Sequence, residues 1–173
     1  MALKKLHLIT IRIGMKKKLL ALLSVAVFSF VGLGFAKEEA SKLAWSTDYA
    51  ASLEKAKSEN KPLLIYFTGS DWCPFCIYMD RDVLSKPEFI DYANKNYVMV
   101  LCDFPRKIKL TETQSQANEK LAATFSIRGF PTMVILDPKS GAYSFAGYEN
   151  GITPKSFIDT VAKTCEKLSK SKK

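Results

Sequence analysis

The sequence predicts an α/β fold in which a central mixed sheet is flanked by helices on both faces. Residues 63–67 and 97–102 are short, continuously apolar runs rich in strand formers, and such runs indicate strands that are covered on both faces. Residues 132–136 and 143–146 are separated by turn residues and predict an antiparallel hairpin. Because helical patterns alternate with the early strands, those strands are expected to be parallel.

We expect residues 1–36 to be a secretory signal peptide. Three lysines follow Met15 and lead directly into an apolar run at residues 19–35, and a positive region before an apolar core is typical of such peptides. Cleavage is expected after Ala36. Met15 is the expected first residue of the translated protein, so residues 1–14 are expected to be an over-extension of the sequence before the true start codon. The apolar run has 17 residues, just short of a bilayer span, so an uncleaved membrane anchor is the alternative.

Residues 37–173 are expected to form a single domain with a basic C-terminal tail. Removing 36 of the 173 residues leaves 137, enough for one hydrophobic core and too few for two. Six of the 26 basic residues lie in the removed segment, which leaves 20 basic against 17 acidic residues and a net charge of about +3. The basic residues that remain gather at residues 106–109 and 167–173, where exposed charges favour solubility. We therefore expect no nucleic-acid partner.

The composition excludes several kinds of active site. The chain has four cysteines and one histidine, His7, which precedes the apolar run. The expected mature chain therefore lacks the imidazole that Cys/His zinc sites, Cys-His proteases and Ser-His-Asp hydrolases need. We expect neither a metal nor another cofactor. Export brings cysteines into an oxidising compartment, where a Cys-x-x-Cys pair is either a disulfide or a group that handles disulfides.

The first half of the expected domain predicts a helix, a strand and a second helix. Ser46 or Thr47 can cap the first helix, which is expected to end near Asn60. The strand at residues 63–67 leads through a turn to Cys73, which is expected at the N-terminus of the next helix. Pro87 interrupts this second helix, and residues 88–95 then make a further helical stretch.

The second half predicts the remaining strands and two more helices. Thr153 is followed by a proline, which predicts a helix cap followed by proline at the first helical position. The expected segments are a strand at 97–102, a polar and basic segment at 105–115, a helix through 117–125, the hairpin strands at 132–136 and 143–146, and a last helix that begins after Thr153.

Cys73 and Cys76 form the candidate redox pair. At a helix N-terminus the helix dipole and the free amides favour the thiolate of Cys73. Cys73 is therefore expected to attack a substrate disulfide, and Cys76, one turn further into the helix, to resolve the mixed disulfide. An inert disulfide is one alternative. Half of a four-cysteine metal site is another, which is disfavoured because Cys102 and Cys165 do not have Cys-x-x-Cys spacing.

Other cysteines and aromatic residues are expected in the core. Cys102 and Cys165 fit small buried apolar positions on a strand and a helix, with a second disulfide between them as the alternative. The aromatic residues expected in the core are Trp45, Tyr78, Phe89 and Phe125.

Two motifs resemble the thioredoxin superfamily. One is WCPFC at residues 72–76, after a buried strand, and the other is IRGFPT at residues 127–132, far downstream. The resemblance implies the thioredoxin fold over essentially the whole expected mature chain, with Pro131 as a cis-proline against the disulfide. It also implies that the backbone of Phe130 pairs with an extended substrate segment. The substrate-binding residues that it implies are Trp72, Pro74, Phe75, Phe130 and Pro131.

Residues 61–73 are also similar to exported thioredoxin-like reductases, including the C-terminal domain of the DsbD electron transporter and DsbH-type proteins. The sequence departs from thioredoxin where thioredoxin has a buried aspartate beneath its cysteines. Tyr66 and Phe67 occupy the corresponding strand positions. The proton acceptor for Cys76 is therefore open, and Asp71, Asp103 and water are the candidates.

The dipeptide between the two cysteines bears on the direction of electron flow. Pro74 and Phe75 carry no charge, whereas the oxidising DsbA type, which this sequence also resembles, has a histidine that stabilises the thiolate. Less thiolate stabilisation means a more negative potential. We expect a periplasmic, monomeric reductase of disulfide-containing exported proteins, supplied by a membrane electron donor of DsbD type and associated with the membrane only through the signal segment. An oxidase or isomerase is the nearest alternative, and a redox-inert or copper-handling binding module is the alternative from another class.

Overall fold

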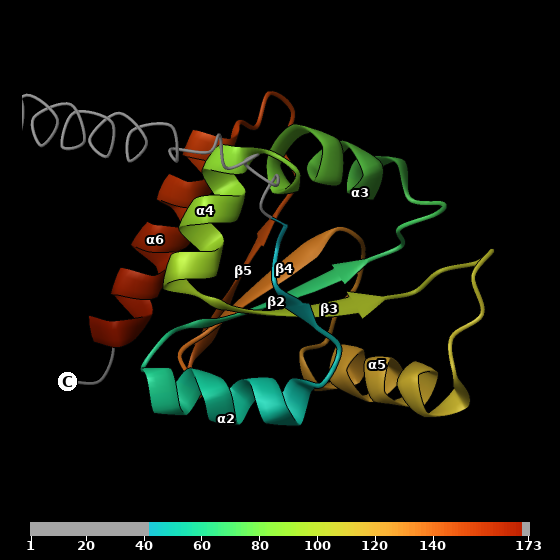
Figure 1. The fold of residues 1–173 in the computed structure, drawn as a ribbon, viewed down its shortest axis with the longest axis horizontal. Coiled ribbons are helices and arrows are strands. Elements are labelled where there is room, and N and C mark those ends of the chain that lie inside the picture. The colour runs from blue at the N-terminus through green and yellow to red at the C-terminus, as the bar shows by residue number, and fades with distance from the viewer. Residues whose placement is uncertain (1–41, 171–173) are drawn as a thin grey trace, which may run out of the picture. The chain divides into compact units, whose positions relative to one another are not determined.

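The computed structural model describes residues 42–170, which contain a five-stranded sheet between two layers of helices (Figure 1). The strand order is β1-β3-β2-β4-β5, in which β3 pairs in parallel with β1 and β2, and β4 pairs antiparallel with β2 and β5. The expected signal peptide lies outside the described residues. The strands are β1 (Trp45–Ser46), β2 (Leu63–Thr68), β3 (Val98–Asp103), β4 (Thr132–Leu136) and β5 (Tyr143–Gly147).

Helices cover both faces of the sheet, as Figure 1 shows: α2 and α5 lie on one face, and α3, α4 and α6 on the other. Among residues 42–170, no helix is long and apolar enough to cross a membrane. The helices are α2 (Tyr49–Glu59), α3 (Pro74–Met79), the π-helical turn η1 (Asp80–Leu84), α4 (Pro87–Asn96), α5 (Glu112–Thr124) and α6 (Pro154–Lys170).

The central strand β2 separates two hydrophobic clusters. Its side chains alternate between the faces, so that Leu64 and Tyr66 pack in the cluster that also contains residues of α4 and α6. Ile65 and Phe67 pack in the opposite cluster, which contains residues of α2 and α5. All six residues of β2 are buried, which confirms the predicted central strand. The predicted α/β architecture with a mixed sheet and flanking helices is confirmed as well.

Two predicted helix starts are wrong. Neither Ser46 nor Thr47 caps α2; the cap is Asp48, whose side chain accepts a hydrogen bond from the Ala51 amide at 3.0 Å. Ser46 instead belongs to the short strand β1, which the sequence did not predict. Helix α5 begins at Glu112, inside the segment expected to be irregular, because the Thr111 side chain caps it.

The region after α3 also differs from the prediction. The helix does not continue as a regular α-helix to Pro87, because η1 widens it into a π-helical turn over Asp80–Leu84. Pro87 then stands at the first turn of α4, where its missing amide hydrogen leaves no hydrogen bond unmade.

Cys102 and Cys165 are both free; Cys102 is buried as predicted, whereas Cys165 is only partly buried. Cys102 is buried on β3 in the cluster beside α2 and α5. Cys165 packs against the opposite cluster. The sheet lies between the two sulfur atoms, so a disulfide between these residues does not form in this fold.

Candidate active site

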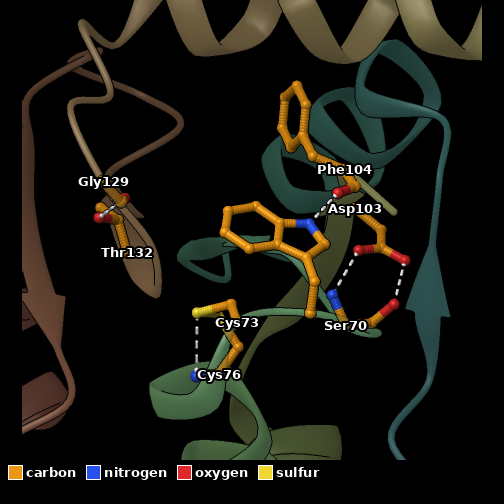
Figure 2. Close-up of a disulfide and its surroundings, with 8 residues drawn as sticks. Ser70, Cys73, Cys76, Asp103, Phe104, Gly129 and Thr132 are labelled. Carbon is orange, nitrogen blue, oxygen red and sulfur yellow. Dashed lines mark hydrogen bonds between the residues drawn. A yellow bond between two sulfur atoms is a disulfide. The ribbon is translucent and has the colours of Figure 1, made fainter. Parts of the chain in front are cut away.

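The end of β2 and the start of α3 place the two cysteines of the pair. Cys73 is the N-cap of α3, with extended backbone angles, and its sulfur accepts a hydrogen bond from the Cys76 amide at 3.2 Å (Figure 2). The two residues form a disulfide with 5.2 Å between their Cα atoms. Cys73 is 4% exposed and Cys76 is fully buried. Solvent therefore reaches the pair only from the side of Cys73.

A network of hydrogen bonds fixes the loop between β2 and α3. The Ser70 amide and hydroxyl donate to the Asp103 carboxylate at 3.0 and 2.6 Å (Figure 2). The Trp72 indole N–H donates to the Phe104 carbonyl oxygen at 2.7 Å. These bonds tie the loop to the end of β3 and hold the Trp72 ring beside the disulfide.

Asp71 organises the segment that follows β3. Its carboxylate accepts hydrogen bonds from the backbone amides of Arg106, Lys107 and Ile108. The Arg106 amide is the main cause that lowers the pKa of Asp71, and the other two amides act in the same direction. Two of the predicted proton acceptors for Cys76 are therefore engaged elsewhere: Asp71 by these amides, and Asp103 by Ser70.

The loop before β4 brings the second motif to the cysteines. The Phe130–Pro131 peptide bond is cis, as the family resemblance implied. β4 pairs with β2, with Leu136 opposite Leu63 at one end and Thr132 opposite Phe67 at the other. Pro131 therefore lies just beyond the end of β2, where the loop to α3 begins. The Phe130 ring contacts Trp72 edge to face, with 6.0 Å between the ring centroids. Both predicted motifs thus meet at one edge of the sheet.

Aromatic side chains flank the disulfide in two groups. The first group contains Phe75, Tyr78 and Tyr148, with ring centroids 5.8 to 6.4 Å apart. Phe75 is 52% exposed and Tyr78 is 39% exposed, so the prediction that Tyr78 belongs to the core is wrong. The sequence did not indicate Tyr148 as a site residue, because it lies far from both motifs along the chain.

The second aromatic group contains Trp72, Phe104 and Phe130. The Phe104 and Phe130 rings are stacked with 5.2 Å between their centroids. The Arg106 guanidinium lies 3.8 Å from the centroid of the Trp72 ring, which is a cation–π contact. The disulfide therefore lies between two apolar surfaces, one of which carries a positive charge.

A cavity beside α3, lined by apolar residues and a few polar ones, contains a residue that the sequence did not indicate. Asp80 lies one helical turn after Cys76 and lines the cavity together with Tyr66, Thr68 and Ser70. Burial raises the pKa of Asp80 to about 6, and the negative charge of Asp103 acts in the same direction. The four-residue spacing from Cys76 was the sequence signal that could have identified Asp80.

The geometry fits thiol-disulfide exchange. One sulfur atom lies at the rim and accepts an amide hydrogen bond, and its partner is enclosed one turn further along. Within residues 42–170, no group of three or more His, Cys, Asp or Glu side chains is arranged to hold a metal ion.

Comparison with known proteins gives the same assignment. Residues 44–138 match the thioredoxin-like family model. The chain is 39% identical over 112 residues to the protein named disulfide bond reductase DsbH of Chlamydia pneumoniae, covering 65% of this chain and 67% of the relative.

Solved structures of the same fold include a DsbH oxidoreductase, with a TM-score of 0.68 and 34% identity over 78% of this chain and 92% of that chain. The oxidised C-terminal domain of DsbD from Neisseria meningitidis has a TM-score of 0.50 and 19% identity, over 66% of this chain and 90% of that domain. The second likeness concerns the fold alone. From the family match, the DsbH relative and the Cys73–Cys76 disulfide, we conclude that the chain belongs to the thioredoxin-like family and is a thiol-disulfide oxidoreductase.

Proposed function

We propose that this protein reduces disulfides in exported proteins, with Cys73 as the attacking residue and Cys76 as the resolving residue. The observation that carries the proposal is the position of the Cys73 sulfur at the N-terminus of α3, where the Cys76 amide donates to it. The same amide and the helix dipole stabilise a thiolate when the disulfide is reduced.

The proposed reaction has two exchange steps. The Cys73 thiolate attacks one sulfur of the substrate disulfide, and the other substrate sulfur leaves as a thiolate. The Cys76 thiolate then attacks the Cys73 sulfur, which forms the Cys73–Cys76 disulfide and releases the second substrate thiolate. Two electrons pass from the protein dithiol to the substrate disulfide, and a donor must reduce the protein again.

The modest stabilisation of the Cys73 thiolate favours the reductase direction. Pro74 occupies the first helical position and has no amide hydrogen, so it removes one potential donor from this helix end. Within the described part of the chain, the hydrogen bond to the Cys73 sulfur comes from a neutral amide and none comes from a charged side chain. A weakly stabilised thiolate leaves the disulfide comparatively stable, and such a pair donates electrons rather than accepts them.

The two aromatic groups supply the proposed substrate surface. Trp72 precedes Cys73 in the chain and Pro74 and Phe75 follow it, whereas Phe130 and Pro131 come from the loop before β4. Exposed aromatic rings bind apolar side chains without requiring one sequence. We therefore propose that the protein accepts extended segments of different exported proteins, provided that apolar residues flank the disulfide.

The proposed location and partners follow from the expected signal peptide and from the relatives. A chain exported to the periplasm meets proteins with unwanted disulfides, and it needs electrons from across the membrane. We propose a membrane donor of DsbD type and a monomeric protein. The relative named disulfide bond reductase DsbH supports the reductase assignment.

Equilibration against a series of glutathione buffers tests the direction of electron flow. We expect a potential near the thioredoxin value of about −270 mV and far from the DsbA value of about −120 mV. The protein should also reduce insulin when dithiothreitol is supplied. A potential above about −180 mV would reject the reductase proposal in favour of an oxidase or isomerase. A pair that fails to cycle at all would indicate a redox-inert binding module.

A further inference from the structure

The proposed reaction requires Cys76 to lose a proton in a buried place. Cys76 has no exposed surface, and its thiol must become a thiolate before it can attack Cys73. Phe67, one of the two residues at the position of the thioredoxin aspartate, cannot accept a proton. Asp71 and Asp103 are held by backbone amides and by Ser70, respectively. Water or another side chain must therefore take the proton.

The cavity beside α3 contains two buried hydroxyl groups that lack a well-formed hydrogen bond. It has a volume of about 580 Å³ and opens between the ends of β2 and β3, η1 and the residues before β1. Tyr66 and Thr68 line it and are each 1% exposed. Among the described residues, neither the Tyr66 nor the Thr68 hydroxyl oxygen has a partner at full hydrogen-bond geometry, although the Tyr66 hydroxyl faces the Asp80 carboxylate. Buried hydroxyl groups without partners are costly, and they indicate a place that holds water.

Asp80 connects this cavity to Cys76. Its backbone amide donates to the Cys76 carbonyl oxygen, so the two residues have the i,i+4 relation of a regular helical turn. Side chains in that relation lie on the same helix face, with roughly 5–6 Å between their Cβ atoms. The Asp80 side chain lines the cavity with Tyr66, Thr68 and Ser70.

We propose that Asp80 accepts the proton of the Cys76 thiol when the mixed disulfide is resolved, directly or through a water molecule in this cavity. The proton moves from the Cys76 sulfur to the Asp80 carboxylate, and the Cys76 thiolate then attacks Cys73. The released substrate thiolate takes up a proton from the Asp80 carboxyl group or from solvent. The step conserves protons and moves no electrons other than the two that pass in the proposed exchange reaction. This inference rests on the proposed function.

The surroundings of Asp80 suit this role. Burial is the main cause that raises its pKa to about 6, and Asp103, from β3, adds a like charge. Tyr66, from β2, lies beside the carboxylate and partly offsets the rise. Lys42, from the segment before β1, also lines the cavity. A carboxylate with a raised pKa is a stronger base than an ordinary aspartate, and it is still ionised at pH 7.

The test separates attack from resolution. Reduced protein is mixed rapidly with excess dithiobis(nitrobenzoate), so that the first thionitrobenzoate is released when Cys73 attacks and the second when Cys76 resolves. This leaving group needs no proton, so the second phase reports the deprotonation of Cys76. We expect Asp80→Asn to slow the second phase at pH 7 by roughly 10- to 100-fold. This factor does not exceed the smallest rate enhancement that is usual for a positioned proton acceptor. The first phase should change much less.

The pH profile and a matched variant complete the test. In the wild type, the rate of the second phase should rise through an inflection near the pKa of Asp80, and Asp80→Asn should lose that inflection. Asp80→Glu should recover part of the rate. Asp82→Asn removes a charge two residues later, where Asp82 pairs with Arg81, and should leave both phases unchanged. An Asp80→Asn second phase as fast as in the wild type, with the same pH profile, would overturn the proposal. This outcome does not depend on the redox potential, so the proposed function can fail separately.

Discussion

At the scale of single residues, the two sulfur atoms of the disulfide lie in different surroundings. The Cys73 sulfur caps a helix and lies at the rim of the site, whereas Cys76 is enclosed by the core. A substrate sulfur can contact Cys73, which keeps a small exposed surface, whereas Cys76 has none. This asymmetry is the physical reason for the different roles that we propose.

Trapping experiments test this division of roles. Cys76→Ser should accumulate a mixed disulfide between Cys73 and its substrate, because no second thiol remains to release it. Cys73→Ser should accumulate none. The adducts are counted by mass spectrometry after acid quenching and thiol blocking, with the Cys73→Ser, Cys76→Ser double variant as the background from Cys102 and Cys165. Equal trapping by the two single variants would contradict the assignment.

Gly69 makes room for the Trp72 ring. A Cβ atom at residue 69 would lie 2.5 Å from the Trp72 Cε2 atom, closer than atoms can pack. The ring cannot move freely, since its indole N–H is bonded to Phe104 and Arg106 lies over its face. We expect Gly69→Ala to reduce the free energy of unfolding by about 1–3 kcal/mol, to alter the tryptophan fluorescence and to weaken substrate turnover.

Gly129→Ala is the matched control for stability. A Cβ atom at residue 129 would have no neighbour within 4 Å, so the free energy of unfolding should stay within about 0.5 kcal/mol of the wild type. Unchanged stability and fluorescence in Gly69→Ala would show that the position of the indole ring does not depend on Gly69.

The residue scale also shows what the sequence could not predict. The motifs indicate Cys73, Cys76 and Pro131 as site residues, because their spacing and order along the chain carry the information. Asp80 belongs to no motif; its spacing from Cys76 is visible in the sequence, but its burial and the cavity that it lines are not. Tyr148 reaches Phe75 only after β4 and β5 have paired. Contacts of this kind depend on tertiary structure, which local patterns do not contain.

At the scale of elements, side-chain caps set the helix starts. Three polar side chains lie close together before α2, and the sequence alone favoured Ser46 or Thr47 as the cap. Ser46 instead accepts a hydrogen bond from the Asp48 amide at 3.1 Å, which positions the true cap. The choice between neighbouring polar residues depends on backbone angles that the short strand β1 imposes.

Replacing the cap tests this arrangement. Asp48→Ala should lower the free energy of unfolding by about 1 kcal/mol, because the Ala51 amide loses its acceptor. Thr47→Ala is the control, and it should change stability by less than about 0.5 kcal/mol. Urea denaturation measures both values. A larger loss for Thr47→Ala than for Asp48→Ala would instead favour the cap that the sequence predicted.

Long and strongly patterned elements were predicted well. The strand at residues 132–136 has the predicted bounds, and α6 begins directly after Thr153. β1 has two residues, too few to give any periodic pattern. The π-helical turn η1 is also invisible to local patterns, since its apolar residues fit an ordinary helix. Its residues Val83 and Leu84 pack in the cluster with α4 and α6.

At the scale of the whole molecule, the sheet separates two environments that serve different purposes. The hydrophobic cluster beside α2 and α5 contains Phe67 and Cys102. The cluster with α4 and α6 also borders the cavity that Asp80 lines. Burial raises the pKa of the Cys102 thiol to about 12, so this cysteine stays protonated and unreactive. The same fold therefore keeps one thiol unreactive and a carboxylate reactive.

A reactive buried carboxylate should cost stability. The pKa of Asp80 is about 6 in the folded protein against 3.8 ordinarily, so the folded state binds the proton more tightly than the unfolded state. The contribution of Asp80 is therefore most favourable below pH 3.8, and it is lost as the pH rises through about 6. A shift of this size corresponds to at most about 3 kcal/mol, and solvent reaching the half-buried side chain reduces the expected loss to about 1–2 kcal/mol.

Asp80→Asn should therefore be more stable than the wild type at pH 7, by about 1–2 kcal/mol, although it resolves mixed disulfides more slowly. The advantage should shrink as the pH falls from 6 to 4, because the wild-type carboxyl group becomes neutral as well. Urea denaturation of both proteins at several pH values measures the difference in their free energies of unfolding. The contributions of the other carboxyl groups cancel in this difference, because both proteins contain them. Asp82→Asn should show no such gain, since Arg81 lowers the pKa of Asp82.

Parallel stability curves for Asp80→Asn and the wild type would show that the carboxylate is not destabilised by burial. A gain in stability together with a loss of resolution rate would mean that the fold carries an unfavourable charge because the reaction needs it.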